Sequence, residues 1–493
     1  MKKNINMDLC VLKKDGGYKL NKEACIERCA ERYKVYRSNI QEKYAGVNVD
    51  GQIKEYDMQT EEFKRDVRNF IREESGLDYI DNQTVKGIID YLSDKTFYDE
   101  PKKLASRAYY DLANDCIYID MCDGCNVISI SKAGITKMQR PIAMFKEYLT
   151  DKPLTEYIEA EASKVPSIIQ KITRLSWEDA VILTTYMVAC LYGNSKPVPI
   201  LFITGPMGSS KTSLSRLIKD CIDPSEGGMF ALSENLKDIA IAASKRLLCV
   251  FDNTGGLKNK KKLSDLLCTV VTKGSMQMRT LYTTKDETVL QFCSNIVING
   301  IDYLAEQCDL LNRCIMIELD TIPEEERKTE KQMDIEIKKA MPELLGGLYA
   351  IMMKTLVMDD IAVSKLNRMA DYELLAIKAA VAMGISAEEF QNMLNKNIQN
   401  MQYSFAMSDI TVKALVMLMA NQETWEGSMS ELHIECYNIL NGKVLKSELA
   451  AYPQNESAFS RHLKGIEKLM VPLGITFKTK KTNKNMQITV SRE

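Results

Sequence analysis

Apolar positions in the first part of the chain recur at helical spacing. Between residues 61 and 74, the apolar side chains that share one face of a helix are Phe63, Val67, Phe70 and Ile71. A second stretch with this period covers residues 85–92. We therefore expect residues 1–100 to be mostly helical. Residues 101–155 change to short runs rich in Ile, Val and Tyr, which predicts a small β-rich adaptor.

The middle of the chain alternates short apolar runs with helical patterns. The runs are residues 199–204, 247–251, 295–298 and 314–319. Such alternation predicts a mainly parallel α/β sheet. A helix over residues 177–191, with Ser176 as its N-cap, precedes the first run. We assign 156–335 to this core, 336–425 to a helical lid or connector, and 426–493 to a separate C-terminal domain.

Composition narrows the class of protein. The 493 residues are 45% hydrophobic and 27% charged, as in an ordinary globular protein. No apolar run is long enough to span a membrane and no signal segment opens the chain, so we expect a cytoplasmic protein without a membrane partner. The formal net charge is −2, so any contact with nucleic acid must be local. The 14 cysteines are scattered, which suits a reducing compartment.

One pair of cysteines, Cys122 and Cys125, has the C-x-x-C spacing of half a zinc site. Only two histidines exist and no second cysteine pair follows at ribbon spacing. The intervening Asp123-Gly124 is typical of a hairpin turn between β-strands. We favour the turn over the metal site.

The segment GPMGSSKT follows the first apolar run of the core and precedes a helical pattern. It matches a phosphate-binding loop, G-x-x-x-x-G-K-[ST], except that Ser210 replaces the second glycine. Such a loop directs backbone N–H groups at phosphate oxygens, with a lysine for the β- and γ-phosphates and a hydroxyl for Mg²⁺. The candidate nucleotide-binding residues are Gly205, Pro206, Met207, Gly208, Ser209, Ser210, Lys211 and Thr212. If the φ angle of Ser210 is positive, its Cβ costs about 1 kcal/mol, which weakens the site without abolishing it.

Polar residues also follow the later apolar runs. Asp252 ends a buried run and, with Thr212, is a candidate for holding Mg²⁺. Asn253 stands where a glutamate would polarise the attacking water, so turnover is more doubtful than binding. Asn299 is a candidate sensor of the γ-phosphate or water, and Arg313 is a candidate to reach the ATP of a neighbouring subunit. Since ligands bind at the carboxyl edge of such sheets, we expect the strand-end residues to converge there.

These segments resemble AAA+ ATPases of the superfamily 3 helicase type. They are most similar to the helicase halves of phage, plasmid and integrative-element primase-helicases, and to poxvirus and staphylococcal island replication proteins. The matching stretches are ILFITGPMGSSKTSLSRLIKDCIDP, LLCVFDNTGGL, RTLYTTKDET, NIVINGID, DLLNRCIMIEL and RMADYELL. The resemblance covers residues 55–493 and is strongest over 196–375.

The resemblance implies an AAA+ P-loop ATPase core that uses ATP and Mg²⁺, assembles as a homo-hexameric ring and is driven by DNA. It also allows a separate primase or initiator as a partner. Relatives with Asp-Asn after this strand are familiar, so Asn253 resembles a variant of the family.

A hairpin predicted over residues 273–295 would project into the ring channel in helicases of this kind. Lys285 would lie near its tip, with Lys273 and Arg279 as further candidates for contacting the DNA backbone. A surface hairpin with solvated lysines is the alternative. The basic run over residues 258–262 is more typical of a solvated loop.

The C-terminal residues predict a helix, capped by Asn455 or Ser457, followed by two strands. This order is that of a winged helix. Seven basic residues lie between 461 and 484 against one acid, Glu467. The candidate DNA contacts are Arg461, Lys464, Lys480, Lys481 and Lys484. A protein-binding winged helix with a solvated charged face is the alternative.

Two functions remain open. The first is an ATP-dependent, ring-forming helicase or translocase that acts on single- and double-stranded DNA in the replication of a mobile element or phage. The second is an ATP-gated DNA-binding initiator, regulator or defence ATPase that hydrolyses slowly and does not unwind DNA. The resemblance favours the first, whereas Ser210 and Asn253 favour the second.

Overall fold

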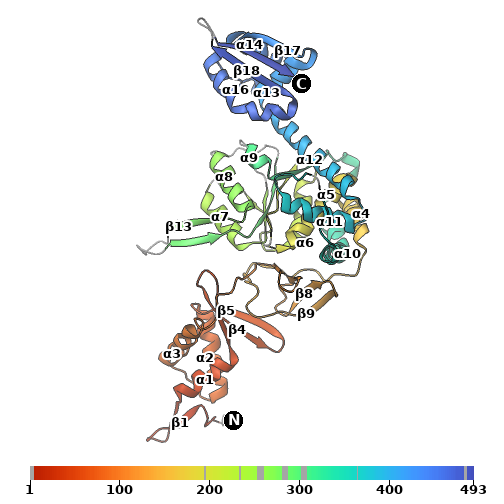
Figure 1. The fold of residues 1–493 in the computed structure, drawn as a ribbon. Helices are drawn as coiled ribbons and strands as arrows, with labels where there is room; N and C mark the ends of the chain where they lie inside the picture. Colours follow the sequence, from red (N-terminus) through yellow and green to blue (C-terminus); the bar gives the residue numbers. More distant parts are fainter. Residues whose placement is uncertain are drawn as a thin grey trace.

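In the computed structural model the chain forms four modules that follow one another in space as in sequence (Figure 1). They are an N-terminal module (residues 5–98), an adaptor (99–154), a central module (155–408) and a C-terminal module (409–492). The structure describes residues 5–193, 196–231, 235–252, 260–279, 287–300, 308–363, 365–481 and 486–492.

The N-terminal module mixes helices and strands. Its helices are α1 (Lys22–Arg32), α2 (Glu61–Ser75) and α3 (Asn82–Lys95), and its strands are β1 (Cys10–Leu12), β2 (Tyr18–Leu20), β3 (Lys34–Arg37), β4 (Lys43–Val49) and β5 (Gln52–Asp57). The expectation of a mostly helical region is therefore wrong for residues 34–57, where β3, β4 and β5 form an antiparallel sheet. Asp50 and Gly51 join β4 to β5 with φ angles of 54° and 87°, as a tight hairpin turn requires.

The adaptor is a four-stranded antiparallel sheet in the order β6-β7-β8-β9. Its strands are β6 (Ala108–Asp111), β7 (Cys116–Asp120), β8 (Asn126–Ser131) and β9 (Gly134–Gln139). The turn predicted at Asp123 is confirmed, because this carboxylate accepts the backbone N–H groups of Cys125 and Asn126 between β7 and β8. Within the described residues no three His, Cys, Asp or Glu side chains gather as a metal site.

A five-stranded parallel sheet forms the middle of the central module, in the order β11-β12-β15-β10-β16. The strands are β10 (Ile200–Thr204), β11 (Phe230–Ala231), β12 (Leu248–Asp252), β15 (Asn295–Asn299) and β16 (Cys314–Glu318). The predicted α/β sheet is thus present. An antiparallel hairpin, β13 (Ser275–Arg279) with β14 (Glu287–Gln291), projects from the side of this sheet (Figure 1).

Helices cover both faces of the sheet. One face packs on α4 (Val165–Thr173), α5 (Trp177–Leu191), α6 (Lys211–Ile222), α10 (Glu330–Val357) and α11 (Ala370–Ala382). The other packs on α7 (Leu236–Lys245), α8 (Lys260–Val271), α9 (Cys308–Leu311) and the end of α12 (Ala387–Ser408). The expected boundary at residue 335 does not separate two bodies, because α10 and α11 share one buried core with α5. Helix α5 has the expected bounds, and the Ser176 side chain accepts the N–H of Asp179 as its cap.

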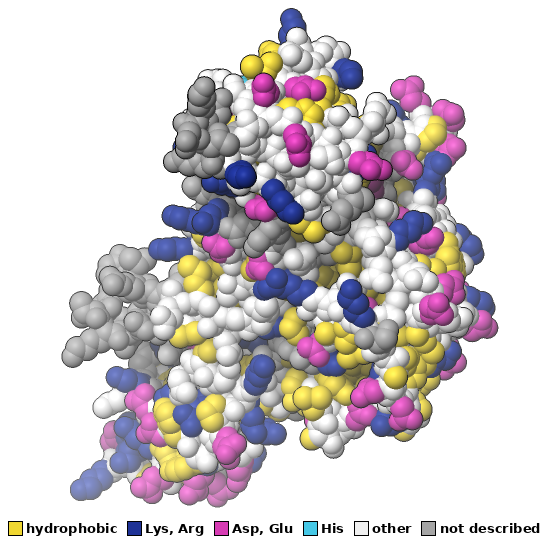
Figure 2. Space-filling view, turned by 45° about the horizontal axis from the view of Figure 1, so that its top comes forward, with side chains coloured by type: hydrophobic (Ala, Val, Ile, Leu, Met, Phe, Trp, Pro, Cys, Tyr) yellow, Lys and Arg dark blue, Asp and Glu magenta, His cyan; other side chains and the backbone are white. Residues whose placement is uncertain are grey.

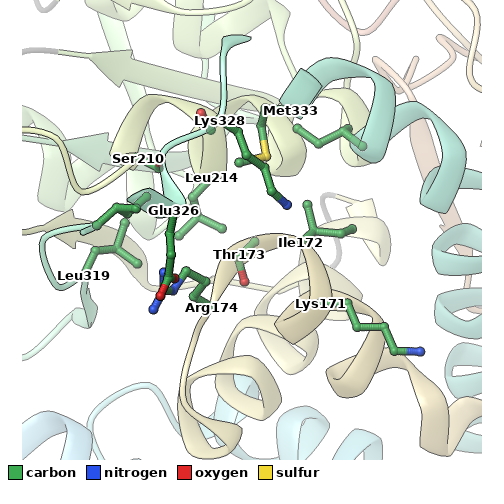
Figure 3. Close-up of a pocket in the computed structure, with 13 residues that line it drawn as sticks. Lys171, Ile172, Thr173, Arg174, Ser210, Leu214, Leu319, Glu326, Lys328 and Met333 are labelled. Atoms are coloured by element: carbon green, nitrogen blue, oxygen red, sulfur yellow. The ribbon is translucent and has the colours of Figure 1, made fainter. Parts of the chain in front are cut away.

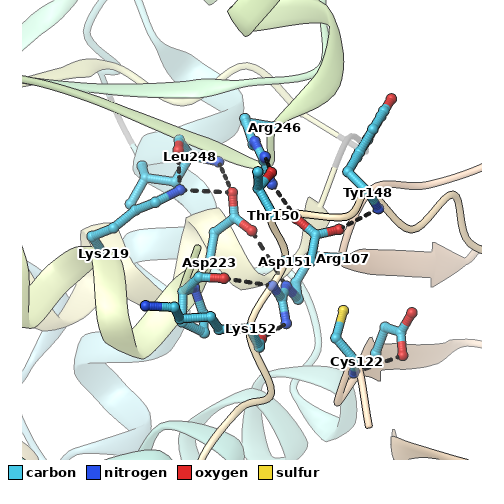
Figure 4. Close-up of polar contacts among 12 residues, drawn as sticks. Arg107, Cys122, Tyr148, Thr150, Asp151, Lys152, Lys219, Asp223, Arg246 and Leu248 are labelled. Atoms are coloured by element: carbon cyan, nitrogen blue, oxygen red, sulfur yellow. Dashed lines mark hydrogen bonds and ion pairs between the residues drawn. The ribbon is translucent and has the colours of Figure 1, made fainter. Parts of the chain in front are cut away.

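Buried charges join the adaptor to the central module (Figure 4). Arg107 is fully buried and donates to Asp223 Oδ1 (3.3 Å) and to the carbonyl oxygen of Pro224 (2.9 Å). Lys219 donates to Asp223 Oδ2 (3.0 Å) and to the carbonyl oxygen of Leu248 (2.8 Å). Burial alone would raise the pKa of Asp223, but Lys219 and Arg107 hold it below its ordinary value. Since Asp223 caps the C-terminus of α6, this network ties that helix to the adaptor.

The C-terminal module packs three main helices on a three-stranded antiparallel sheet, β17-β19-β18. Its elements are α13 (Ile410–Leu418), β17 (Thr424–Ser428), α14 (Met429–Leu440), α15 (Lys446–Leu449), α16 (Glu456–Met470), β18 (Ile475–Lys481) and β19 (Met486–Arg492). Helix α13 belongs to this core, so the module begins near residue 410 and not at the expected 426. The Asn455 side chain caps α16 as predicted.

None of the described helices is by itself long and apolar enough to cross a membrane. Residues 387–408 and 410–421 meet that criterion only as a pair, by length and composition, and the two helices are bent by 101° at the break between them.

Candidate functional site

The segment GPMGSSKT connects β10 to α6 at the carboxyl edge of the central sheet. Gly205 and Gly208 have φ angles of 147° and 79°, a region that side chains rarely adopt. A Cβ on Gly205 would lie 2.4 Å from the carbonyl oxygen of Leu319, so only glycine fits there. The loop therefore has the strand-loop-helix context expected from the sequence.

Ser210 is in the left-handed region, with φ 60° and ψ 29°. This position is the one where the motif has glycine, and the serine Cβ costs about 1 kcal/mol there. Ser210 is also the N-cap of α6, yet its side chain makes no capping hydrogen bond. The first backbone N–H groups of α6 are thus left for another acceptor, as in an anion site at a helix N-terminus.

Lys211 points back over the loop. Its Nζ donates to the carbonyl oxygens of Gly205 and Pro206, both at 2.8 Å. Burial lowers the pKa of Lys211, and the nearby Asp252 carboxylate opposes that shift. Carbonyl oxygens are weak partners for an ammonium group, so an incoming phosphate oxygen would be a stronger one.

Thr212 and Asp252 meet across the base of the loop. Thr212 Oγ1 lies 3.4 Å from Asp252 Oδ2. The other oxygen, Asp252 Oδ1, is buried and has no hydrogen-bond partner among the described residues. A hydroxyl beside a buried carboxylate with a free oxygen is the ligand chemistry that Mg²⁺ prefers. These residues fit a magnesium ion.

The order of the strands in the sheet explains why the strand-end residues lie close together. Strand β15 lies between β10 and β12, and Asn299 at its end pairs in register with Ile203. Asn299 is buried and donates from Nδ2 to Ser215 Oγ of α6 (2.9 Å). It thus lies in the same row of strand ends as the phosphate loop. Asn253 lies outside the described residues.

Arg313 is at the opposite edge of the sheet, directly before β16. Its guanidinium binds the Asp309 carboxylate and backbone carbonyl, and burial leaves little of it exposed. Arg368 binds the other oxygen of Asp309 at 2.6 Å. The structure therefore does not bring Arg313 to the phosphate loop of its own chain. The pairing of Arg368 with Asp309 was not foreseen, since the two residues are far apart in the sequence.

A pocket adjoins the loop on the side of Ser210 and Leu214 (Figure 3). It encloses about 570 Å³ including its mouth. Apolar side chains, among them Ile172 and Met333, and the cations Lys171, Arg174 and Lys328 line it. The sequence offered no signal for it, because its walls come from α4, α6 and α10.

The hairpin candidates have different outcomes. The structure does not favour Lys273 as a DNA contact, because its Nζ already donates to the carbonyl oxygens of Cys293 (3.1 Å) and Ser294 (2.8 Å) and to Asn295 Oδ1 (2.7 Å). Burial lowers its pKa to about 8. The side chain of Arg279 and all of Lys285 lie outside what the structure describes.

In the C-terminal module, Arg461 and Lys464 are exposed on α16 and Lys480 is exposed on β18. Helix α16 contacts β18, so these side chains belong to adjoining elements. The side chains of Lys481 and Lys484 are outside the described part.

The comparisons match two segments of the chain to family models. Residues 169–397 match the family described as actinomycete integrative conjugative element replication protein, and residues 412–493 match the AICE RepA C-terminal domain. The second segment coincides with the C-terminal module. No curated protein matches the sequence.

Among solved structures, the chain aligns with the A form apo structure of the NrS-1 C terminal region. The TM-score is 0.39 and the identity 11%, over 94% of this chain and 98% of that chain. Another apo structure of the same region aligns with TM-score 0.39 and 12% identity, over 94% and 97% of the two chains. TM-scores of this size support no argument about fold or activity. The two family matches, in order along the chain, show that this protein is similar to the replication proteins of integrative conjugative elements.

Proposed function

We propose that the protein is an ATP-driven DNA helicase or translocase that works as a ring in the replication of its element. The observation that carries the proposal is the meeting of Lys211, Thr212 and Asp252 at one edge of a parallel sheet, with the unpartnered Asp252 Oδ1 among them. A pocket adjoins the loop beside Ser210 and Leu214.

Each residue has a role that its position supports. The backbone N–H groups of the loop and of α6 bind phosphate oxygens, and Lys211 neutralises the β- and γ-phosphates. Thr212 and Asp252 would hold Mg²⁺, which neutralises charge that develops on the phosphates. Asn299 is assigned as the sensor of the γ-phosphate or of the attacking water. Arg313 is assigned to the active site of the neighbouring subunit in the ring.

The DNA contacts are assigned to two elements. The hairpin β13–β14 is the channel element, with Lys285 and Arg279 as its cations. The C-terminal module has the helix and strand order of a winged helix, and its exposed Arg461, Lys464 and Lys480 support a contact with the phosphate backbone.

The second candidate function is an ATP-gated DNA-binding protein with slow hydrolysis. The strained Ser210 favours it, because a loop that costs about 1 kcal/mol to hold binds nucleotide less tightly. Both candidates use the same site and differ in turnover.

The first prediction tests the site. Lys211→Ala and Asp252→Ala should each lower ATP hydrolysis by roughly 10² to 10³-fold, because phosphate charge loses a fixed cation or a metal ligand. The rate is measured with and without single-stranded DNA. Lys338→Ala, an exposed lysine of α10, is the matched control and should leave the rate unchanged.

An unchanged rate of ATP hydrolysis in Lys211→Ala or Asp252→Ala would contradict the assignment of the nucleotide site. A parent rate that DNA does not stimulate would favour the slow, ATP-gated binder.

A further inference from the structure

One cleft carries an excess of basic side chains. Figure 2 shows basic and acidic side chains mixed over the face in view, in keeping with the net charge of −2. The cleft lies where the N-terminal module, the adaptor and the base of the β13–β14 hairpin meet, and it encloses about 1110 Å³ including its mouth. Four lysines line it, Lys103, Lys146, Lys245 and Lys273, against one acid, Glu42.

The acid is already neutralised. Glu42 accepts from Lys146 Nζ at 2.6 Å and from the Tyr44 hydroxyl at 2.7 Å. Lys103 and Lys245 are exposed, and neither forms an ion pair with a residue in the described ranges. The lining therefore retains an excess of positive charge that the protein itself does not compensate.

The Tyr148 ring lies beside two of these lysines, Lys146 and Lys245. Lys146 Nζ lies 5.7 Å and Lys245 Nζ 5.9 Å from the centre of the Tyr148 ring, and the Arg246 guanidinium lies 5.5 Å from it. Cation–π attraction of this kind is worth about 0.5–1 kcal/mol at an exposed site and favours positions of Lys146 and Lys245 near the ring. Lys273 is fixed at the inner wall by its three acceptors, and it contributes charge without donating to a ligand.

The cleft lies next to the base of the β13–β14 hairpin. Asn39 of the N-terminal module donates from Nδ2 to Gln291 Oε1 of β14 at 2.9 Å, so the module is joined to the hairpin at its base. A nucleic-acid strand that lies along the hairpin would therefore reach the cleft at the base of the hairpin.

We propose that this cleft binds single-stranded DNA through its phosphate backbone. Phosphodiesters are the repeated anions that several spaced lysines recognise without sequence preference. Residues of three modules line this cleft, and we expect such a recess to admit a flexible single strand more readily than a stiff duplex. The inference takes DNA as the ligand from the proposed function, but it needs neither ATP hydrolysis nor a ring. It gives the N-terminal module a role, as one wall of a DNA path.

The test uses the full chain without nucleotide and a fluorescently labelled oligothymidylate, with binding followed by anisotropy over a series of salt concentrations. The double variant Lys103→Glu/Lys245→Glu should bind roughly tenfold more weakly or worse. Its log–log salt slope should be shallower by about 0.7 for each lost contact. The matched control Lys338→Glu/Lys339→Glu makes the same charge change on exposed positions of α10 and should bind as the parent does.

Unchanged affinity and slope in the cleft variant would overturn the inference, as would an equal loss in the control. Displacement of the labelled strand by an unlabelled duplex as readily as by a single strand would also overturn it. Lys103→Gln/Lys245→Gln repeats the test with neutral side chains at these exposed positions, and its melting temperature should match that of the parent.

The basal ATPase rate separates this inference from the proposed function. If the parent shows no DNA-stimulated hydrolysis, but oligothymidylate binding still depends on the cleft lysines, the helicase proposal fails and the cleft stands. If DNA stimulates hydrolysis and the cleft variants bind like the parent, the cleft inference fails and the helicase proposal stands.

Discussion

At the scale of single residues, Ser210 determines how much strain the phosphate loop carries. A β-branched side chain is a far worse occupant of a left-handed position than serine, at a cost of about 1–3 kcal/mol. Ser210→Val should therefore weaken nucleotide binding by roughly tenfold, measured by calorimetric titration. Ser210→Gly should bind at least as tightly as the parent. Ser457→Val, at an exposed helical position of α16 in the C-terminal module, is the control.

Equal affinity of Ser210→Val and the parent would contradict the strain argument. If Ser210→Gly hydrolyses ATP much faster than the parent, the serine lowers the hydrolysis rate. That result would favour the ATP-gated DNA-binding protein with slow hydrolysis as the natural function.

His462 makes the stability of the C-terminal module depend on pH. Its Nε2 lies 2.8 Å from Asp409 Oδ2, and this hydrogen bond raises the pKa of His462. The raised pKa means that the charged pair stabilises the folded state fully below the unfolded pKa of about 6.5, and that this stabilisation is lost as pH rises through the folded pKa. The His462 side chain is 39% exposed, so solvent reduces the effect.

At about pH 6 we expect the melting temperature of the parent to be higher than that of His462→Gln. The difference between the two melting temperatures should be smaller at about pH 8. Tryptophan fluorescence can follow the transition, because Trp425 lies in the core of this module. A difference in melting temperature that is the same at both pH values would contradict the stabilising role of the His462–Asp409 pair.

At the scale of elements, the ribbon β18–β19 is the part of the C-terminal module that would contact duplex DNA. Replacing Lys480, Lys481 and Lys484 together with Ala should weaken duplex binding and reduce the log–log salt slope by about 0.9 for each lost contact. The control replaces three exposed lysines of α10, Lys331, Lys338 and Lys339. An unchanged slope would favour the protein-binding interpretation of this module.

At the scale of the whole molecule, the proposed ring requires active sites that two subunits share. Arg313 lies at the edge of the sheet opposite to Lys211, so in the proposed ring it would act at the site of another chain. An arginine supplied in trans contributes ~10³-fold or more in known phosphoryl-transfer systems. Mixing inactive Arg313→Ala and Lys211→Ala chains should therefore restore some ATPase activity, because some interfaces then have both groups.

Co-assembly of the two variants is checked by pull-down of differently tagged chains. Co-assembly without recovered ATPase, or full activity of Arg313→Ala alone, would contradict the shared site. Arg313 and Arg368 both bind the Asp309 carboxylate. In such a ring, Arg313 must leave Asp309 to bind the phosphate of the neighbouring subunit.

The sequence by itself determined the features that depend on near neighbours in the chain. Helix 177–191 and its Ser176 cap, the Asn455 cap, the turn at Asp123 and the strand-loop-helix around Lys211 all follow from periodicity and local hydrogen bonding. The sheet of the N-terminal module also has such a signal in Asp50-Gly51, but the prediction for this region rested on the helical patterns at residues 61–74 and 85–92.

Only the tertiary structure decided which distant groups become partners. Lys273 and Lys285 are equally basic in the sequence, yet backbone carbonyls some twenty residues away occupy the Lys273 ammonium. The pairing of Arg107 with Asp223, the pocket beside the loop and the lysine cleft each combine segments from separate modules or helices. A local pattern reports the periodicity of burial, whereas the partner of a buried charge depends on which chain segments pack against it.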